Sequence, residues 1–240
     1  PVWDEHEISN FEYDHPDRYT TEKIRTIKEG CDPVDFSCLY MQRGIAKEGL
    51  AFPYDEMQYY NGVLPSDEPD NVIFFCDVAF GGGDSLSMPI CYVYGDTGYI
   101  TDLIFDRNDK TKTEPRVVGK IMQHKCRMGR FEANNGGDFY ATDIDKMLKS
   151  ENYRCNISSK KAPTTQSKMS RIEQYAPDIR RFLFLHPSLQ SDEYKRFMNE
   201  LTAFSFTSDN LHDDAPDSMA GLAAYMLERP RVVSVVQRPF

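Results

Sequence analysis

Acidic residues at three positions in this sequence lie next to apolar segments, where a carboxylate on the protein surface is not expected. Asp77 lies near the end of the apolar, strand-like run at residues 71–79, and Glu132 ends a shorter run before an Asn/Gly turn. The third position is an acidic cluster just before an apolar helix-like stretch, and it holds Asp213, Asp214 and Asp217. A carboxylate at a buried strand is costly unless it pairs with a cation or binds a metal ion.

Each position also has a plainer structural explanation. Asp77 can cap the glycine loop that follows it, Glu132 can cap the next helix, and Asp214 with Asp217 has the spacing of a capping box. Capping alone does not call for so dense an acidic cluster, because like charges repel. A divalent cation removes that repulsion, and carboxylate oxygens suit Mg²⁺ or Mn²⁺. Two such ions about 3.5–4 Å apart can activate water and stabilise the leaving oxygen of a phosphodiester, so the pattern predicts a hydrolytic site with two ions.

To meet at one site, these acids need a fold that brings strand ends and a helix start together. Hydrophobic spacing predicts three strands in succession, followed by helices and strands in alternation. The predicted strands cover residues 71–79, 87–94, 99–105, 129–132, 153–157 and 182–185. The predicted helices cover residues 21–30, 114–128, 138–149, 166–181 with an interruption at Pro177, 192–204 and 214–227. Hairpin strands pair antiparallel and strands joined by helices pair parallel. The order predicts an α/β fold with a ribonuclease H-like mixed sheet (three antiparallel strands followed by parallel strands) flanked by helices, although other α/β folds share this order.

The net charge of -10 is spread unevenly along the 240 residues. Residues 1–70 hold 16 Asp+Glu and 6 Lys+Arg, whereas residues 110–171 hold 6 Asp+Glu and 14 Lys+Arg. A basic stretch beside a carboxylate cluster suits a nuclease, because cations bind phosphates while carboxylates bind metal. A solvated basic face is the commoner explanation of such a stretch.

Several classes of protein are excluded or disfavoured by absent patterns. No apolar run approaches the roughly 18 residues of a membrane span, so no membrane partner is expected. No phosphate-binding loop of the G-x-x-x-x-G-K-[ST] kind occurs, which argues against ATPase activity. The six cysteines form no C-x-x-C pair, and we expect reduced, buried thiols. No signal peptide opens the chain, and Pro1 as first residue suggests a fragment of a longer protein.

Residues 61–70 read as a boundary, since this short stretch combines two prolines, a glycine and several acids. We therefore expect residues 1–70 to form a linking segment and residues 71–240 to form the globular domain.

Three phrases in this order resemble the nuclease domain of phage terminase large subunits: CDVAFGGGDSLS, FEANNGG and HDDAPDSMAG. The resemblance covers about residues 36–228, and it implies a ribonuclease H-like fold and two Mg²⁺ or Mn²⁺ ions. It implies metal ligands at Asp77, Glu132 and the acidic cluster, where Asp214 is favoured over Asp217 and then Asp213. Asp84 matches an acid after the family's glycine run, as an accessory ligand or a partner of the ligands. His212 is expected to hydrogen-bond a ligand or carry a proton.

The resemblance extends to a basic helix start at residues 164–172, which makes Lys168 and Arg171 candidates for contacts to DNA phosphate. Lys160 and Lys161 are weaker candidates, and ordinary surface charge is the alternative for all four. The implied partners are double-stranded DNA, a packaging ATPase domain of the same full-length chain, a portal and a small terminase subunit. The implied location is the cytoplasm of an infected or lysogenic bacterial host, in association with the procapsid.

Three alternatives stay open at this point. The chain can be another ribonuclease H-like nuclease of the resolvase or transposase type. It can be a non-catalytic module that docks on a portal or on DNA. The acids can also be caps and surface charges in an unrelated α/β protein.

Overall fold

The computed structural model divides the chain into two compact units, Pro1–Glu48 and Gly49–Phe240. The structure describes residues 2–3, 6, 8–13, 18–30, 39–40, 49–79, 85–161, 166–207 and 210–228. The predicted site residue Asp84 lies outside them. In the first unit, helix α1 (Thr21–Gly30) buries Ile24 in a small cluster with Val2 and Trp3. The helix predicted over residues 21–30 is thereby confirmed.

The second unit begins before the boundary expected at residue 70. Strand β1 (Gln58–Tyr60) joins the sheet by pairing parallel with β7 (Leu183–Leu185). The Arg180 guanidinium donates two hydrogen bonds to the Ala51 carbonyl oxygen, at 2.7 and 3.0 Å. Residues 49–70 therefore pack with the globular unit, and the assignment of residues 1–70 to a linking segment stays a prediction.

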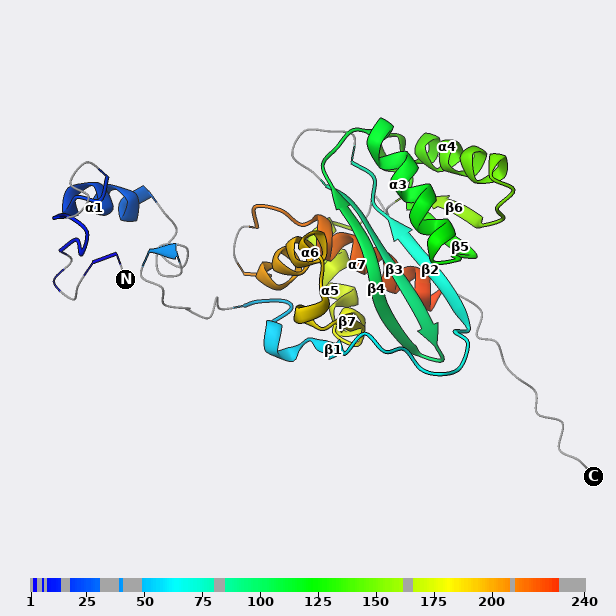
Figure 1. Ribbon diagram of the computed structural model, residues 1–240, viewed down its shortest axis with the longest axis horizontal. Helices are drawn as coiled ribbons and strands as arrows, with labels where there is room; N and C mark the ends of the chain where they lie inside the picture. The colour runs from blue at the N-terminus through cyan, green and yellow to red at the C-terminus, as the bar shows by residue number, and fades with distance from the viewer. Residues whose placement is uncertain are drawn as a thin grey trace, which may run out of the picture. The chain divides into compact units, whose positions relative to one another are not determined.

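A seven-stranded mixed sheet, in the order β1-β7-β4-β3-β2-β5-β6, runs through the second unit (Figure 1). Its remaining strands are β2 (Asn71–Cys76), β3 (Leu86–Tyr94), β4 (Thr97–Asp106), β5 (Met128–Glu132) and β6 (Asn156–Lys160). Strands β2, β3 and β4 pair antiparallel, whereas β5 pairs parallel with β2 and with β6, and β7 pairs parallel with β4. The predicted ribonuclease H-like sheet is confirmed.

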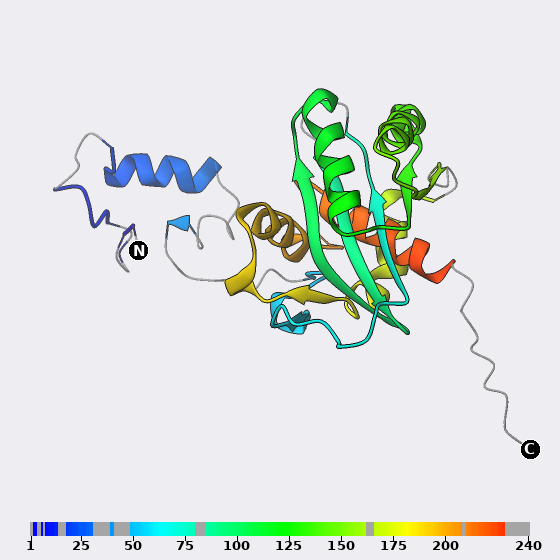
Figure 2. The same ribbon diagram turned by 45° about the vertical axis from the view of Figure 1, so that its right-hand side comes forward.

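Helices cover both faces of the sheet (Figures 1 and 2). On one face lie α3 (Lys110–Gln123) and α4 (Gly137–Ser150), and on the other lie α5 (Lys168–Ile179), α6 (Asp192–Ala203) and α7 (Asp214–Leu227). The part of the chain that the structure describes also holds 3-10 turns at Tyr54–Glu56, Asn134–Gly136 and Pro187–Leu189. None of the described helices is long and apolar enough to cross a membrane.

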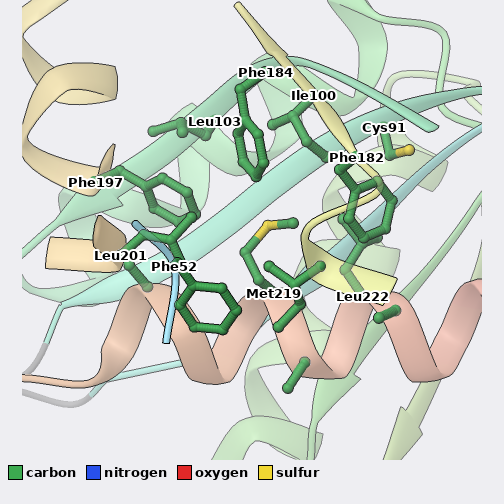
Figure 3. Packing of buried hydrophobic residues seen from close by; sticks show 14 of the residues in the cluster. Phe52, Cys91, Ile100, Leu103, Phe182, Phe184, Phe197, Leu201, Met219 and Leu222 are labelled. Atoms are coloured by element: carbon green, nitrogen blue, oxygen red, sulfur yellow. The ribbon is translucent and has the colours of Figure 1, made fainter. Parts of the chain in front are cut away.

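Helix α7 is the centre of the larger hydrophobic core. Figure 3 shows Met219 and Leu222 of this helix among aromatic side chains that include Phe52, Phe182 and Phe197. Burying one such side chain contributes roughly 1.5–3 kcal/mol, so packing anchors α7 firmly against the sheet. The acids at its start are therefore held in place by the core behind them.

Two boundary predictions were wrong in ways that matter. Helix α5 continues through Pro177 to Ile179, so the predicted interruption does not occur; Pro177 lies in the last turn, where the loss of one backbone hydrogen bond is tolerated. Strand β6 spans Asn156–Lys160 rather than residues 153–157. Cys76, Cys91 and Cys126 are buried, as expected, whereas Cys155 is half-buried, and Cys31 and Cys38 lie outside the described residues.

Candidate metal centre

Asp77 and Glu132 lie side by side because their strands are parallel neighbours. Strand β5 pairs with β2 so that Phe131 is opposite Cys76, and each acid follows one residue later. The Asp77 backbone is fixed by a bridge to Ser87 of β3, with N–O distances of 2.9 and 3.0 Å. Carboxyl ends of parallel strands share one edge of a sheet, so this pairing supplies two of the predicted acids.

The start of α7 supplies two further carboxylates, and both are buried. The side chains at Asp214 and Asp217 are 4% and 3% exposed. Asp214 accepts a hydrogen bond of 2.7 Å from the Ser85 backbone N–H, just before β3. Asp213 is the residue that precedes the helix, and its side chain makes no capping hydrogen bond. Since Asp213 precedes the helix and Asp214 binds the Ser85 N–H, Asp214 and Asp217 do not form the capping box that their spacing allowed.

Two cations from the start of α5 reach into the acids. Lys168 Nζ lies 2.6 Å from Asp213 Oδ1 and 3.3 Å from Asp217 Oδ2. Arg171 donates from Nε to Asp217 Oδ1 at 2.9 Å, and its guanidinium lies 3.4 Å from Glu132 Oε2. The two side chains proposed as DNA contacts thus bind the predicted metal ligands and join α5, α7 and β5. We call the five acids, Asp77, Glu132, Asp213, Asp214 and Asp217, together with these two cations, the carboxylate cluster.

The acids of this cluster carry more negative charge than the two cations offset. Burial, with Glu132 and Asp217 nearby, raises the pKa of Asp77 to about 8, and Lys168 offsets this only in part. Burial also raises the pKa of Glu132, although Arg171 opposes the shift. For Lys168, burial lowers the pKa, but Asp217 and Asp213 outweigh it and the net shift is upward. Such shifts mark a site where added positive charge is favoured.

The type of donor, although not its arrangement in this structure, fits a hard divalent cation. Every candidate ligand is a carboxylate, and Asp77 has no hydrogen bond or ion pair to its carboxylate within the described residues. Over the same residues, no three His, Cys, Asp or Glu side chains stand in an arrangement that could hold an ion. Lys168 and Arg171 hold Asp213, Asp217 and Glu132 in ion pairs, so bound ions require these cations to shift.

The remaining predicted residues surround the cluster at greater distance. His212 is half-buried and lies near Glu200. Burial raises the pKa of Glu200, and His212 opposes this shift only in part. Lys160 is exposed and forms an ion pair of 2.7 Å with Glu228 Oε1. Lys161 is exposed as well. The roles of Lys160 and Lys161 in binding DNA, and the role of His212 beside a metal ligand, stay predictions.

Three charged residues of this region were missed from the sequence. Glu200 of α6 accepts a hydrogen bond of 2.9 Å from the Ala215 N–H, and so caps α7 in place of a local side chain. Arg130 and Glu228 form an ion pair of 2.7 Å across β5 and α7. Sequence patterns over a few residues cannot predict these pairs, because the partners are far apart along the chain.

The fold and the carboxylates at its strand ends define a class: a ribonuclease H-like domain with a candidate metal centre. No family model and no curated protein matches the sequence. Among solved structures, the terminase nuclease domain of human cytomegalovirus, soaked with Mn and bound to an inhibitor, is similar with a TM-score of 0.52 and 10% identity. That match covers 75% of this chain and 96% of the other.

A second similar structure is the large terminase of a thermophilic bacteriophage, with a TM-score of 0.50 and 10% identity. The match covers 86% of this chain and 52% of that terminase, so this chain spans about half its length. At such identities the likeness establishes the fold. The predicted resemblance to terminase nuclease domains is confirmed at that level.

Proposed function

We propose that this domain is a metal-dependent endonuclease that cleaves double-stranded DNA during viral genome packaging. The observation that carries the proposal is the convergence of Asp77, Glu132, Asp214 and Asp217 from three distant segments into one cluster with excess negative charge. Carboxylates from separate elements can surround a pair of ions, which one short segment cannot do.

Asp77, Glu132, Asp214 and Asp217 would hold two Mg²⁺ or Mn²⁺ ions, with Asp213 as a further ligand. When bound, such ions supply an activated water and offset the charge that develops on the phosphodiester. The buried start of α7 and its cap from Glu200 fix Asp214 and Asp217 before the substrate arrives. Lys168 and Arg171, released from these acids when the ions bind, would contact phosphates of the DNA backbone.

The packaging context is part of the same proposal. It rests on the fold shared with the large terminase of the thermophilic bacteriophage, of which this chain spans about half. The proposed partners are an ATPase domain of the same full-length chain, a portal and a small terminase subunit, in an infected bacterial host with its procapsid. Sequence preference at the cut is expected to be low, because backbone contacts carry no sequence information directly.

Supercoiled-plasmid cleavage tests the proposal directly. The wild-type chain, with Mn²⁺ or Mg²⁺, is expected to nick and linearise the plasmid, and EDTA is expected to stop cleavage. Asp77→Ala is expected to abolish cleavage while circular dichroism shows an intact fold. Cleavage by this variant at the wild-type rate would mean that the metal centre is misplaced.

The ion pairs that Lys168 and Arg171 make with the acids favour a second candidate function, a non-catalytic module that docks on a portal or on DNA. It predicts no cleavage with either metal, together with DNA binding that metal does not strengthen. The plasmid assay and a binding titration with and without Mn²⁺ therefore separate the two candidates.

A further inference from the structure

A groove beside the carboxylate cluster extends along α7, away from the predicted metal ligands. Its volume is about 130 Å³, and it starts at Glu132 and Arg171 and ends at Glu228. Arg130, Lys160 and Lys161 also line it, so four of its side chains are basic. We call this feature the α7 groove. The groove shares Glu132 and Arg171 with the carboxylate cluster, so the two features are continuous.

The β-sheet side of the groove is set by strand periodicity. Side chains two residues apart on a strand share a face, so Arg130 and Glu132 point the same way from β5 and lie about 7 Å apart. Lys160 of β6 is the register partner of Glu132 and shares that face. A predicted metal ligand thus has two cations, as well as Asp77, as neighbours at this edge of the sheet.

The helix side of the groove is set by helical periodicity. Asp217, Gly221, Ala224 and Glu228 follow at intervals of three or four residues, which places them in one stripe along α7. Gly221 is required there, because a Cβ would come within 2.3 Å of the Phe75 ring. Small residues in the middle of the stripe leave the groove open. Its acidic end at Glu228 lies about 16 Å along the helix axis from Asp217.

The Glu228 carboxylate occupies the cations at the far end of the groove. Its two oxygens lie 2.7 Å from Lys160 Nζ and 2.7 Å from an Arg130 guanidinium nitrogen. The Arg130 guanidinium also stacks over Tyr225 at 4.4 Å, and its buried Nε has no hydrogen-bond partner among the described residues. Rigid placement of this kind suits the recognition of an oxyanion.

The contacts that hold Glu228 can be exchanged. The Glu228 side chain is 42% exposed and Lys160 is 57% exposed, so the ion pair between them contributes little, whereas Arg130 is only 15% exposed and its pair with Glu228 is less screened by solvent. Glu228 also caps the C-terminus of α7, where the helix dipole disfavours a negative charge. An incoming phosphate can replace this carboxylate because it presents oxyanion oxygens to the same two cations, Arg130 and Lys160.

We propose that the α7 groove binds a phosphate of the DNA strand neighbouring the cleaved phosphodiester, and that Glu228 occupies this phosphate subsite when DNA is absent. This inference rests on the proposed function, because it assigns the subsite to the same DNA substrate. Arg130 and Lys160 are the phosphate contacts, and Glu228 acts as an internal competitor that lowers affinity.

Fluorescence anisotropy with a labelled DNA duplex, titrated over a range of salt concentrations in EDTA, tests the subsite on the 240-residue chain. Glu228→Gln is expected to tighten binding about threefold or more, because the carboxylate no longer competes with DNA phosphate for Arg130 and Lys160. Lys160→Gln is expected to weaken binding and to reduce the salt slope by about one. Lys160 is exposed, so its replacement does not endanger the fold.

The matched control is Asp145→Asn, which frees Lys149 from an exposed ion pair of 2.5 Å on α4, at the other face of the sheet. This change also removes one negative charge, and it is expected to leave affinity close to wild type. Equal tightening by Asp145→Asn and Glu228→Gln would overturn the subsite, since net charge alone would explain both. An unchanged salt slope in Lys160→Gln would overturn it as well.

Binding in EDTA does not depend on cleavage, so the two proposals fail separately. If the wild-type chain does not cleave plasmid with either metal, the proposed function fails whatever the anisotropy shows. If Asp77→Ala is inactive but the Glu228 and Lys160 variants bind like wild type, the nuclease stands and the phosphate subsite falls.

Discussion

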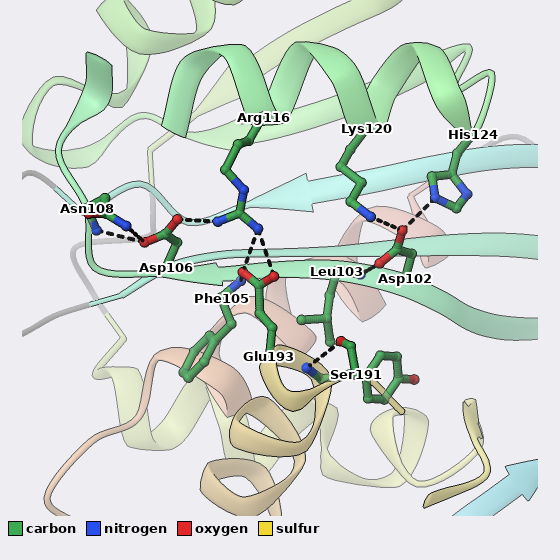
Figure 4. Close-up of polar contacts among 11 residues, drawn as sticks. Asp102, Leu103, Phe105, Asp106, Asn108, Arg116, Lys120, His124, Ser191 and Glu193 are labelled. Carbon is green, nitrogen blue, oxygen red and sulfur yellow. Dashed lines mark hydrogen bonds and ion pairs between the residues drawn. The ribbon is translucent and has the colours of Figure 1, made fainter. Parts of the chain in front are cut away.

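Two groups of charged side chains in this domain differ in the ratio of acids to cations. One is the carboxylate cluster. The other, which we call the α3–β4–α6 network, joins three elements through Asp102, Asp106, Glu193, Arg116, Lys120 and His124 (Figure 4). Five acids face two cations in the cluster, whereas three acids face two cations and an imidazole in the network, and each of those three is paired with at least one of them.

The network shows what matched charges do. Arg116 binds Glu193 through both carboxylate oxygens, at 2.7 and 3.0 Å, and also pairs with Asp106. Asp102 accepts from His124 at 2.8 Å and pairs with Lys120. Burial alone would raise the pKa of Asp102, but the hydrogen bonds from His124 and Lys120 outweigh it and lower the pKa. Such charges stabilise the fold and leave nothing for a ligand to neutralise.

The cluster shows what unmatched charges do. Its pKa shifts run upward at Asp77 and Glu132, so the fold holds these carboxylates at a cost. A bound cation would offset this free-energy cost, whereas the acids of the network are already paired with positively charged or hydrogen-bonding side chains. The difference teaches that the ratio of acids to cations, rather than the number of acids, distinguishes a candidate metal site from a structural one.

The largest expected effect is on cleavage. Asp217→Asn is expected to lower the initial rate of plasmid nicking about a thousandfold, because the loss of a proposed metal ligand would remove several kcal/mol of transition-state stabilisation. Asp106→Asn, a matched change in the network, is expected to keep the rate near that of wild type. A similar loss of nicking rate in both variants would mean that the cluster and the network do not differ in their contribution to cleavage.

The second effect is on thermal stability with metal. Mn²⁺ at about 100 times its dissociation constant is expected to stabilise the wild type by about 2.7 kcal/mol, and so to raise Tm by roughly 5–10 °C. Differential scanning fluorimetry should show this shift in Glu193→Gln and not in Asp77→Asn. A full shift in Asp77→Asn would remove Asp77 from the ligand set.

The third effect is the dependence of stability on pH. The pKa of Asp77 is raised in the folded state, from 3.8 to about 8, so the folded protein binds its proton more tightly than the unfolded chain does. Stability should therefore fall as pH rises from about 4 to about 8, by about 2 kcal/mol after allowance for partial exposure. Urea denaturation in EDTA at pH 5 and pH 8 measures this loss.

Two comparisons sharpen the pH result. Asp77→Asn should flatten the decline between pH 5 and pH 8. Asp102 has a lowered folded-state pKa, so its contribution is present above about pH 4 and is lost only below it. The Asp102→Asn variant should therefore keep the wild-type decline, and a decline that persists in Asp77→Asn would argue against the site as described.

The smallest effect is expected in the network. Glu193→Gln removes the carboxylate that binds Arg116, and it should lower the free energy of unfolding by about 1 kcal/mol, because Arg116 is partly exposed. Urea denaturation measures the change. Asp77→Asn should be neutral or stabilising in the same experiment, and a larger loss there than in Glu193→Gln would reverse the comparison.

Local pattern in the sequence determined much of this protein. Hydrophobic spacing predicted the three antiparallel strands and the helix at residues 214–227, because burial of one face imposes a period of two or 3.6 residues on neighbouring positions. Context at strand ends and helix starts singled out Asp77, Glu132 and the acids at 213–217. These signals lie within a few residues of one another along the chain.

Only the tertiary structure decided which charges meet. The register of β5 with β6 brings Lys160 beside Glu132, while the sequence expected that strand three residues earlier. The cap from Glu200, the cations in the cluster and the pairing of Glu228 with Arg130 all join distant segments. Such partners are chosen by long-range packing and strand pairing, which leave no periodic trace in the sequence. The sequence by itself determined where the acids stand, and the folded chain determined what balances them.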